Sequence, residues 1–312
     1  DKLAMLWTND EGAEQRYTFA DIKEQSDRVA SFFLQLGIKR GDCVMMMLKR
    51  RVEFWFTIVA LHKIGAVAIP ATHLLTPKDL IYRNNSAGIR MIVTADDKLI
   101  MQHVEDSLEQ SPTVEFIVST GAEVSGKWIS MAKGKENAPQ FVRPEVVNTN
   151  SDISLLYFTS GSSGQPKMVA HNFLYPLGHI VTAKYWHNVH EKSLHLTVAD
   201  TGWGKAVWGK LYGQWIVGAA VFVYDHEKFT PADILAVMAK YKVTSFCAPP
   251  TIYRFLIRED LSKYDLSSLE YCTTAGEPLN PSVFDSWKNS TGLTIYEGFG
   301  QTETTLTIAT FP

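Results

Sequence analysis

The alternation of helical and strand patterns along the chain is the feature that most constrains its fold. Apolar residues recur at helical spacing from Ile22 to Leu36, and 43–48 follows as a short apolar strand. The same alternation predicts helices over 52–64, 99–108 and 231–241, and strands over 66–69, 91–94, 116–119, 221–224 and 245–248. Strands that are joined by helices pair in parallel, so the pattern predicts an α/β fold of parallel sheets covered by helices.

Local signals predict where several of these helices begin and end. Thr76-Pro77 is typical of a helix start, because threonine caps the free N–H groups and proline suits the first helical turn. Gly37 and Gly65 are placed to end the two helices that precede them, since glycine adopts the left-handed conformation readily.

Composition excludes several classes of protein. The chain has 312 residues, of which 46% are hydrophobic and 20% charged, and its net charge is −3. It therefore has no basic surplus of the kind that nucleic-acid binding requires. The longest apolar run, 215–224, is too short to cross a bilayer and contains Gly218. We interpret this run as a buried strand and expect no membrane span.

Cysteine usage favours a reducing compartment. Cys43, Cys247 and Cys272 are few and far apart, without the spacing of metal ligands. Disulfides are rare in such compartments, so we expect a cytoplasmic location.

Residues 159–167, Thr-Ser-Gly-Ser-Ser-Gly-Gln-Pro-Lys, form a loop suited to bind phosphate. They follow 153–158, which has the pattern of a short buried strand. Glycines let the backbone turn tightly and bring its N–H groups close to an anion, and the hydroxyls add further donors. Lys167 adds a positive charge, so the segment predicts a cradle for phosphate oxygens.

The loop does not match two better-known patterns. A Walker A loop has lysine directly after glycine and a hydroxyl residue next, whereas Pro166 precedes Lys167 and Met168 follows it. A nucleophile elbow fails as well, because Gln165 stands where its second glycine belongs. A flexible surface turn is the remaining alternative.

Three further segments give the chain a family resemblance. They are 63–70 (Lys-Ile-Gly-Ala-Val-Ala-Ile-Pro), 274–278 (Thr-Ala-Gly-Glu-Pro) and 296–303 (Tyr-Glu-Gly-Phe-Gly-Gln-Thr-Glu). With the loop, they resemble in order and spacing the motifs of the adenylate-forming enzymes. This family comprises acyl-CoA synthetases, adenylation domains of peptide synthetases and luciferases. The resemblance runs from about Tyr17 to the end of the chain.

The resemblance implies two similar layered α/β subdomains with mostly parallel sheets, packed face to face. Residues 50–165 would form a subdomain inserted in a second one, made of 1–49 and 170–312, with the loop 159–167 near the junction. A nucleotide would bind between them at the carboxyl ends of the strands. The chain would stop before the family's β-barrel subdomain and its C-terminal domain, which carries a catalytic lysine.

The resemblance also implies a reaction and a set of site residues. A carboxylic acid would attack ATP to give acyl-AMP, and coenzyme A would then displace AMP. Thr302, Glu303 and Lys167 would be catalytic, with Thr302 on the α-phosphate and Glu303 as the ligand of Mg²⁺. Phe299 would lie against the adenine ring, and Glu297 would contact the adenine edge. The full ATP-binding set would be Thr159, Ser160, Gly161, Ser162, Ser163, Gly164, Lys167, Gly276, Glu277, Pro278, Glu297, Gly298, Phe299, Gly300, Gln301 and Thr302.

The acyl pocket would be lined by Trp203, Gly204, Ala275 and Gly300. Acetyl-specific relatives have tryptophan where this chain has Gly300. We therefore expect an acyl group longer than acetyl, medium-chain or aromatic, as in fatty acid metabolism. The alternative is that Trp203 and Trp208 fill the space and leave no pocket.

Three functions remain open. The chain is identified as the N-terminal part of an ATP-dependent acyl-CoA synthetase, inactive by itself. It could instead be an adenylation domain that loads a carrier protein, or a nucleotide-binding module without catalysis. Intact Lys167, Thr302 and Glu303 argue against a degenerate module.

Overall fold

The chain forms two compact units, each built around its own sheet. The computed structural model describes residues 1–146, 148–160 and 164–311. Unit 1 comprises Asp1–Phe19, Tyr175–Ala199 and Gly204–Pro312, and unit 2 comprises Ala20–Leu174 and Asp200–Trp203.

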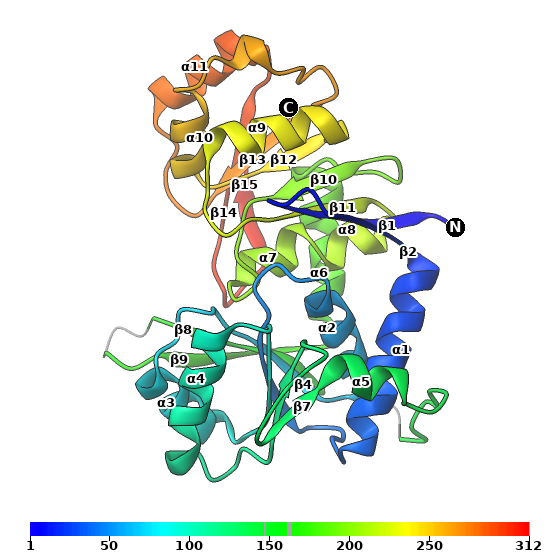
Figure 1. The fold of residues 1–312 in the computed structure, drawn as a ribbon. Coiled ribbons are helices and arrows are strands. Elements are labelled where there is room, and N and C mark those ends of the chain that lie inside the picture. Colours follow the sequence, from blue (N-terminus) through cyan, green and yellow to red (C-terminus); the bar gives the residue numbers. More distant parts are fainter. Residues whose placement is uncertain (147, 161–163, 312) are drawn as a thin grey trace. The chain divides into compact units, whose positions relative to one another are not determined.

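The sheet of unit 1 has eight strands among the described residues, and most of its neighbours are parallel. In spatial order they are β15 (Leu306–Ala309), β14 (Ile295–Gly300), β13 (Tyr271–Ala275), β12 (Ser245–Cys247), β10 (Leu194–Thr197), β11 (Ala220–Asp225), β1 (Leu3–Asn9) and β2 (Glu14–Thr18). Only the pairs at the two edges, β14 with β15 and β1 with β2, are antiparallel. In Figure 1 the blue strand β1 therefore lies beside the green strand β11, although some 200 residues separate them in sequence.

Helices connect the successive parallel strands from β10 to β14 in unit 1, and one of these helices, Pro231–Tyr241, matches a predicted helix. The helices of the unit are α6 (Tyr175–Val181), α7 (Gly204–Gly209), α8 (Tyr212–Ile216), α9 (Pro231–Tyr241), α10 (Pro250–Leu256) and α11 (Pro281–Thr291), with a π-helical turn at Thr182–Trp186 and a 3-10 turn at Leu261–Lys263. A core that includes Phe222, Phe246, Tyr253 and Trp287 joins α9, α10 and α11 to the sheet.

Unit 2 is built in the same way around seven strands in the described part of the chain. Their order is β7 (Trp128–Ser130), β6 (Phe116–Ser119), β5 (Ile89–Thr94), β3 (Cys43–Met47), β4 (Val67–Pro70), β8 (Ile153–Thr159) and β9 (Lys167–Asn172). Only β8 and β9 pair in antiparallel fashion. The helices are α1 (Phe19–Gln35), α2 (Glu53–Ile64), α3 (Pro77–Ala87), α4 (Lys98–Ser107) and α5 (Met131–Glu136), with a 3-10 turn at Leu108–Gln110. The predicted α/β class with mostly parallel sheets is confirmed.

The local helix signals act as expected. The Thr76 side chain accepts from the Asp79 N–H while the Asp79 carboxylate accepts from the Thr76 N–H, so α3 begins with a reciprocal capping box. Gly65 ends α2 in the left-handed conformation at φ +74°.

Several boundaries differ from the sequence-based expectations. Residues 20–49 lie in unit 2, because β3 pairs between β4 and β5 at the centre of its sheet. Residues 170–174 and 200–203 also belong to unit 2, where β9 runs to Asn172 as the antiparallel partner of β8. The run 215–224 is not one strand: α8 ends at Ile216, and only Ala220 onward joins the sheet as β11. Gly218, at φ +78°, provides the turn between them.

Helices that could cross a bilayer are absent from the described residues, since none is both long and apolar enough.

Candidate functional site

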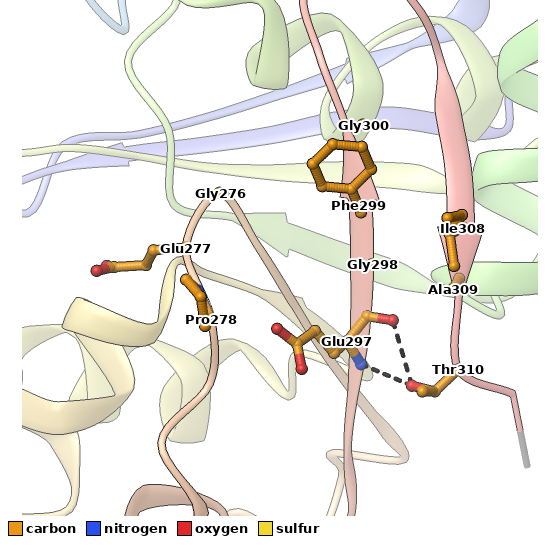
Figure 2. A pocket seen from close by; sticks show the side chains of 10 residues that line it. All are labelled: Gly276, Glu277, Pro278, Glu297, Gly298, Phe299, Gly300, Ile308, Ala309 and Thr310. Carbon is orange, nitrogen blue, oxygen red and sulfur yellow. Dashed lines mark hydrogen bonds between the residues drawn. The ribbon is translucent and has the colours of Figure 1, made fainter.

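Unit 1 contains a pocket of about 410 Å³ at the carboxyl ends of two parallel strands. Three segments line it, as Figure 2 shows: the loop that follows β13, the end of β14, and β15 with the residue after it. The lining residues are Gly276, Glu277, Pro278, Glu297, Gly298, Phe299, Gly300, Ile308, Ala309 and Thr310. The carboxyl edge of a parallel sheet is where α/β proteins place their ligands.

Strand β14 places Phe299 in this pocket by alternation. Successive side chains of a strand point to opposite faces, so Gly298 and Gly300 share the face opposite Phe299. A Cβ atom at Gly298 would lie 2.5 Å from the Trp186 indole, and one at Gly300 would lie 2.2 Å from the Trp208 indole. The glycines thus admit two buried indoles behind the strand, while the Phe299 ring stays 56% exposed for a ligand.

The wall opposite β14 is the loop 276–279, and two carboxylates hold it. Gly276 has φ +113°, a conformation that residues with a Cβ rarely adopt. Glu277 accepts from the Thr251 N–H at 3.1 Å and from the Thr251 hydroxyl, so its carboxylate points away from Phe299 in Figure 2. The hydrogen bond from Thr251 lowers the pKa of Glu277. Glu297 Oε1 accepts from the Leu279 N–H at 3.1 Å, which fixes the far end of the loop.

Thr302 and Glu303 are the central residues of a tight turn. The Thr304 N–H donates to the Gln301 carbonyl at 3.0 Å, and the Gln301 N–H donates to Thr304 Oγ1 at 3.1 Å. The two hydrogen bonds that close the turn are thus made by the flanking residues, Gln301 and Thr304. Glu303 is exposed and Thr302 is half-buried.

Three of the four predicted acyl-pocket residues lie together in unit 1. A Cβ at Gly204, the first residue of α7, would lie 3.6 Å from the Thr302 side chain. Ala275 is buried against Trp186, and its carbonyl accepts from Lys205 Nζ at 2.8 Å. Trp203 belongs to unit 2, where it is 62% exposed.

The space that Gly300 leaves is not empty. The Trp208 indole is only 5% exposed and occupies the volume into which a larger side chain at 300 would extend. The expectation that Gly300 enlarges the pocket is therefore wrong for this position, because α7 supplies an indole from elsewhere in the chain.

The described part of the predicted phosphate-binding loop, 159–167, lies in unit 2 between β8 and β9. Thr159 and Lys167 face each other as the last and first residues of these antiparallel strands. Gly164 has φ +90°, and the Tyr82 hydroxyl donates to the Pro166 carbonyl at 2.9 Å. Lys167 begins a strand, whereas a Walker A lysine leads into a helix. Gly161, Ser162 and Ser163 lie outside the described residues.

Sequence reasoning missed several residues around the turn. Tyr175 donates from its hydroxyl to the Thr304 carbonyl at 3.3 Å, across 129 positions of sequence. Neither Tyr175 nor Thr304 lies in a pattern that marks this contact. Trp208 was considered only as a residue that fills space.

Magnesium is the metal that the family resemblance implies, with Glu303 as its ligand. No group of three His, Cys, Asp or Glu side chains in the described parts of the chain could hold a metal ion. A magnesium ion in a nucleotide site takes one or two carboxylates together with phosphate oxygens, and the exposed carboxylate of Glu303 fits that donor set.

The mostly parallel sheets and the pocket beside Phe299 place the chain among the α/β proteins that have a ligand site at the carboxyl edge of a parallel sheet. The chain belongs to the AMP-binding enzyme family, whose model matches residues 1–312. The predicted family is confirmed.

The curated relatives are acyl-CoA synthetases by name. The chain is 35% identical over 319 residues to the human mitochondrial acyl-coenzyme A synthetase ACSM3, covering 99% of this chain and 52% of the relative. It is 36% identical over 313 residues to the rat mitochondrial acyl-coenzyme A synthetase ACSM5, covering 99% and 53%. The chain thus spans about half the length of the curated relatives it matches. Both relatives are named as mitochondrial, which contradicts the expected cytoplasmic location.

Solved structures share the fold. A Brucella canis acyl-CoA synthetase superposes with a TM-score of 0.90 at 23% identity, over 99% of this chain and 56% of the other. The anthranilate CoA ligase AuaEII, solved with anthranoyl-AMP, gives a TM-score of 0.90 at 24% identity, over 100% and 59%.

Proposed function

We propose that the protein carrying this chain is an ATP-dependent acyl-CoA synthetase. The carboxylate of the acid attacks the α-phosphate of ATP, forming a C–O–P linkage in acyl-AMP and releasing pyrophosphate. The thiol of coenzyme A then attacks the acyl carbon and AMP leaves. Family membership and the names of the relatives support this reaction class.

One observation carries the proposal: a single strand and turn present an aromatic ring, a hydroxyl and a carboxylate within five residues. Phe299 lines the pocket of unit 1 and would lie against the adenine. Thr302 would donate to the α-phosphate, where negative charge develops during the attack. The Glu303 carboxylate would bind magnesium, which supplies charge neutralisation at the phosphates.

The remaining phosphates are assigned to the loop of unit 2. We assign the β- and γ-phosphates to Thr159, Ser160, Gly164 and Lys167, together with 161–163, which lie outside the described residues. The exposed ammonium of Lys167 and the left-handed backbone at Gly164 support the assignment.

Acid-dependent exchange of labelled pyrophosphate into ATP by the full-length protein tests the first half-reaction. We expect exchange with an acid and none without it. Lys167→Ala is expected to reduce kcat/KM at least tenfold, because it removes a charge-assisted phosphate contact. Binding of ATP without exchange would instead favour a nucleotide-binding module, and acyl transfer to a carrier protein but not to coenzyme A would favour the adenylation-domain alternative.

We further propose that the acyl group is longer than acetyl, medium-chain or aromatic. Gly204 and Ala275 support this assignment, because both are small. Gly204 lies near Thr302, and Ala275 pairs with Gly298 on the strand that carries Phe299. Trp208 would then form the back of the acyl pocket. Octanoate and benzoate are expected to exceed acetate in the exchange assay; higher kcat/KM for acetate would contradict the assignment.

We also propose that the 312-residue chain expressed alone forms no acyl adenylate, since it spans about half the length of its relatives. Acid-dependent pyrophosphate release by the isolated chain at a rate comparable to that of the full-length protein would refute this.

A further inference from the structure

We propose that Tyr175 is a positioning residue that holds the turn carrying Thr302 and Glu303 and couples it to Trp208, the proposed back of the acyl pocket. The proposal rests on the function proposed above. It concerns side chains that the sequence motifs do not include.

The turn depends on Thr304. Its N–H and its hydroxyl make the two hydrogen bonds to Gln301 that close the turn around Thr302 and Glu303. Any displacement of Thr304 therefore changes the direction of both central side chains.

The Tyr175 hydroxyl contacts Thr304 at the backbone carbonyl of that residue. This hydroxyl donates to the Thr304 carbonyl at 3.3 Å and accepts from the Trp208 indole N–H at 3.0 Å. A phenol has one proton to donate and lone pairs to accept, so both hydrogen bonds can exist at once. The phenol is protonated at neutral pH and can donate, and burial raises the pKa of Tyr175 further above its ordinary value.

Packing fixes the hydroxyl in place. Tyr175 is 8% exposed, and its ring meets the His179 ring edge-on with centroids 4.5 Å apart. The same imidazole lies 5.8 Å from the Trp208 ring. Gly178, on the same helix as Tyr175, brings the backbone of α6 close to Thr305, where an added Cβ would lie 3.1 Å from the Thr305 methyl.

Trp208 links this support to the acyl pocket. Its ring packs against Gly300 immediately before the turn, and its N–H binds the hydroxyl that supports Thr304. A shift of the indole caused by a bound acyl group would therefore reach Thr304 through a single hydroxyl. On this proposal, Tyr175 connects the back of the acyl pocket to the turn that carries Thr302.

The test uses Tyr175→Phe in the full-length protein, with Tyr253→Phe as the matched control. Tyr253 is fully buried in the same unit, and its hydroxyl donates to the Thr273 carbonyl at 3.2 Å, so its loss removes the same kind of bond away from the turn. In pyrophosphate exchange we expect Tyr175→Phe to lower kcat about tenfold with little change in the KM for ATP, and Tyr253→Phe to keep kcat. Equal kcat values for the two variants would overturn the proposal.

Two further measurements make the result decisive. Amide hydrogen exchange of the peptide 300–306 is expected to accelerate in Tyr175→Phe and not in Tyr253→Phe. Unchanged exchange would overturn the positioning role even if the protein proved to have another activity.

Trp208→Phe keeps an aromatic ring but lacks the N–H, so its effect on kcat is expected to be non-additive with that of Tyr175→Phe. Additive effects would show that the two residues act separately. An inactive wild-type protein with the expected amide exchange would refute the proposed function but support the positioning of the turn.

Discussion

At the scale of single residues, the site depends on glycines that leave space for side chains from distant parts of the chain. Gly298 and Gly300 alternate with Phe299 on β14, and each faces a buried indole. A sequence pattern can mark such glycines as part of a motif. It does not reveal that Trp186 and Trp208 occupy the space beside them, because these contacts join residues about 90 to 110 positions apart.

We predict that Gly298→Ala destabilises unit 1 by about 1–3 kcal/mol, because the added methyl overlaps the Trp186 ring and Leu306. Urea-induced unfolding measures the change. Gly204→Ala is the matched control: its Cβ meets Thr302 at an ordinary 3.6 Å, so little loss of stability is expected.

A second substitution sharpens this test. Trp186→Phe removes part of the overlapping ring, so it is expected to recover part of the stability lost in Gly298→Ala. Strictly additive losses in the double variant would show that the overlap with Trp186 is not the cause.

At the scale of elements, helix ends and hairpins position the residues proposed to bind the nucleotide. Helix α3 begins at a capping box, and its Tyr82 supports the Pro166 carbonyl in the phosphate loop. We therefore expect the stability of this helix start to affect the geometry of the loop 159–167, which lies more than 80 residues further along the chain.

We predict that Thr76→Ala destabilises the protein by about 1 kcal/mol, the usual loss for a helix N-cap. Thr230→Ala is the control, since Thr230 occupies the same position of α9, also before proline, without a side-chain bond to the helix backbone. Comparable losses in the two variants, measured by chemical denaturation, would contradict the capping explanation.

At the scale of the whole molecule, buried histidines are expected to set its acid sensitivity. His187 and His195 are almost fully buried in unit 1, with ring centroids 4.5 Å apart. Burial lowers the pKa of His195 to about 3 and that of His187 well below its ordinary value, and the nearby cations Lys205 and Lys210 act in the same direction. Both imidazoles are therefore neutral in the folded state at neutral pH.

We predict that the free energy of unfolding falls as the pH drops below about 6.5. In that range the unfolded chain takes up protons on these histidines and the folded chain does not, so each histidine lowers stability by about 1.4 kcal/mol per pH unit. The loss from His195 would stop near pH 3, where the folded state also binds the proton. Urea unfolding at pH 7.0, 6.0 and 5.0 measures the slope.

Substitution of His195 tests the cause of this slope. His195→Gln removes one of the buried imidazoles, so it should flatten the dependence of the free energy of unfolding on pH. A slope that is the same in His195→Gln as in the wild type would show that other groups cause the acid sensitivity.

Local sequence patterns are sufficient to predict the class of fold and the family of this chain. Helical and strand periodicity, helix caps such as Thr76-Pro77, and the motifs at 159–167, 274–278 and 296–303 are local, and local physics allows them to be read from neighbouring residues. The class of fold was predicted correctly for this reason. The division at residue 49 differed from the structure, because the place of β3 depends on pairing with strands that come later in the chain.

Long-range packing, in contrast, selects the side chains that fill the space around those motifs. Trp208 occupies the room beside Gly300, Glu277 binds Thr251, and Tyr175 supports Thr304. Each contact joins elements that are distant in sequence, and packing density rather than local pattern selects the side chain that fits. The motif residues mark where a nucleotide would bind, and the fold determines which other side chains hold them there.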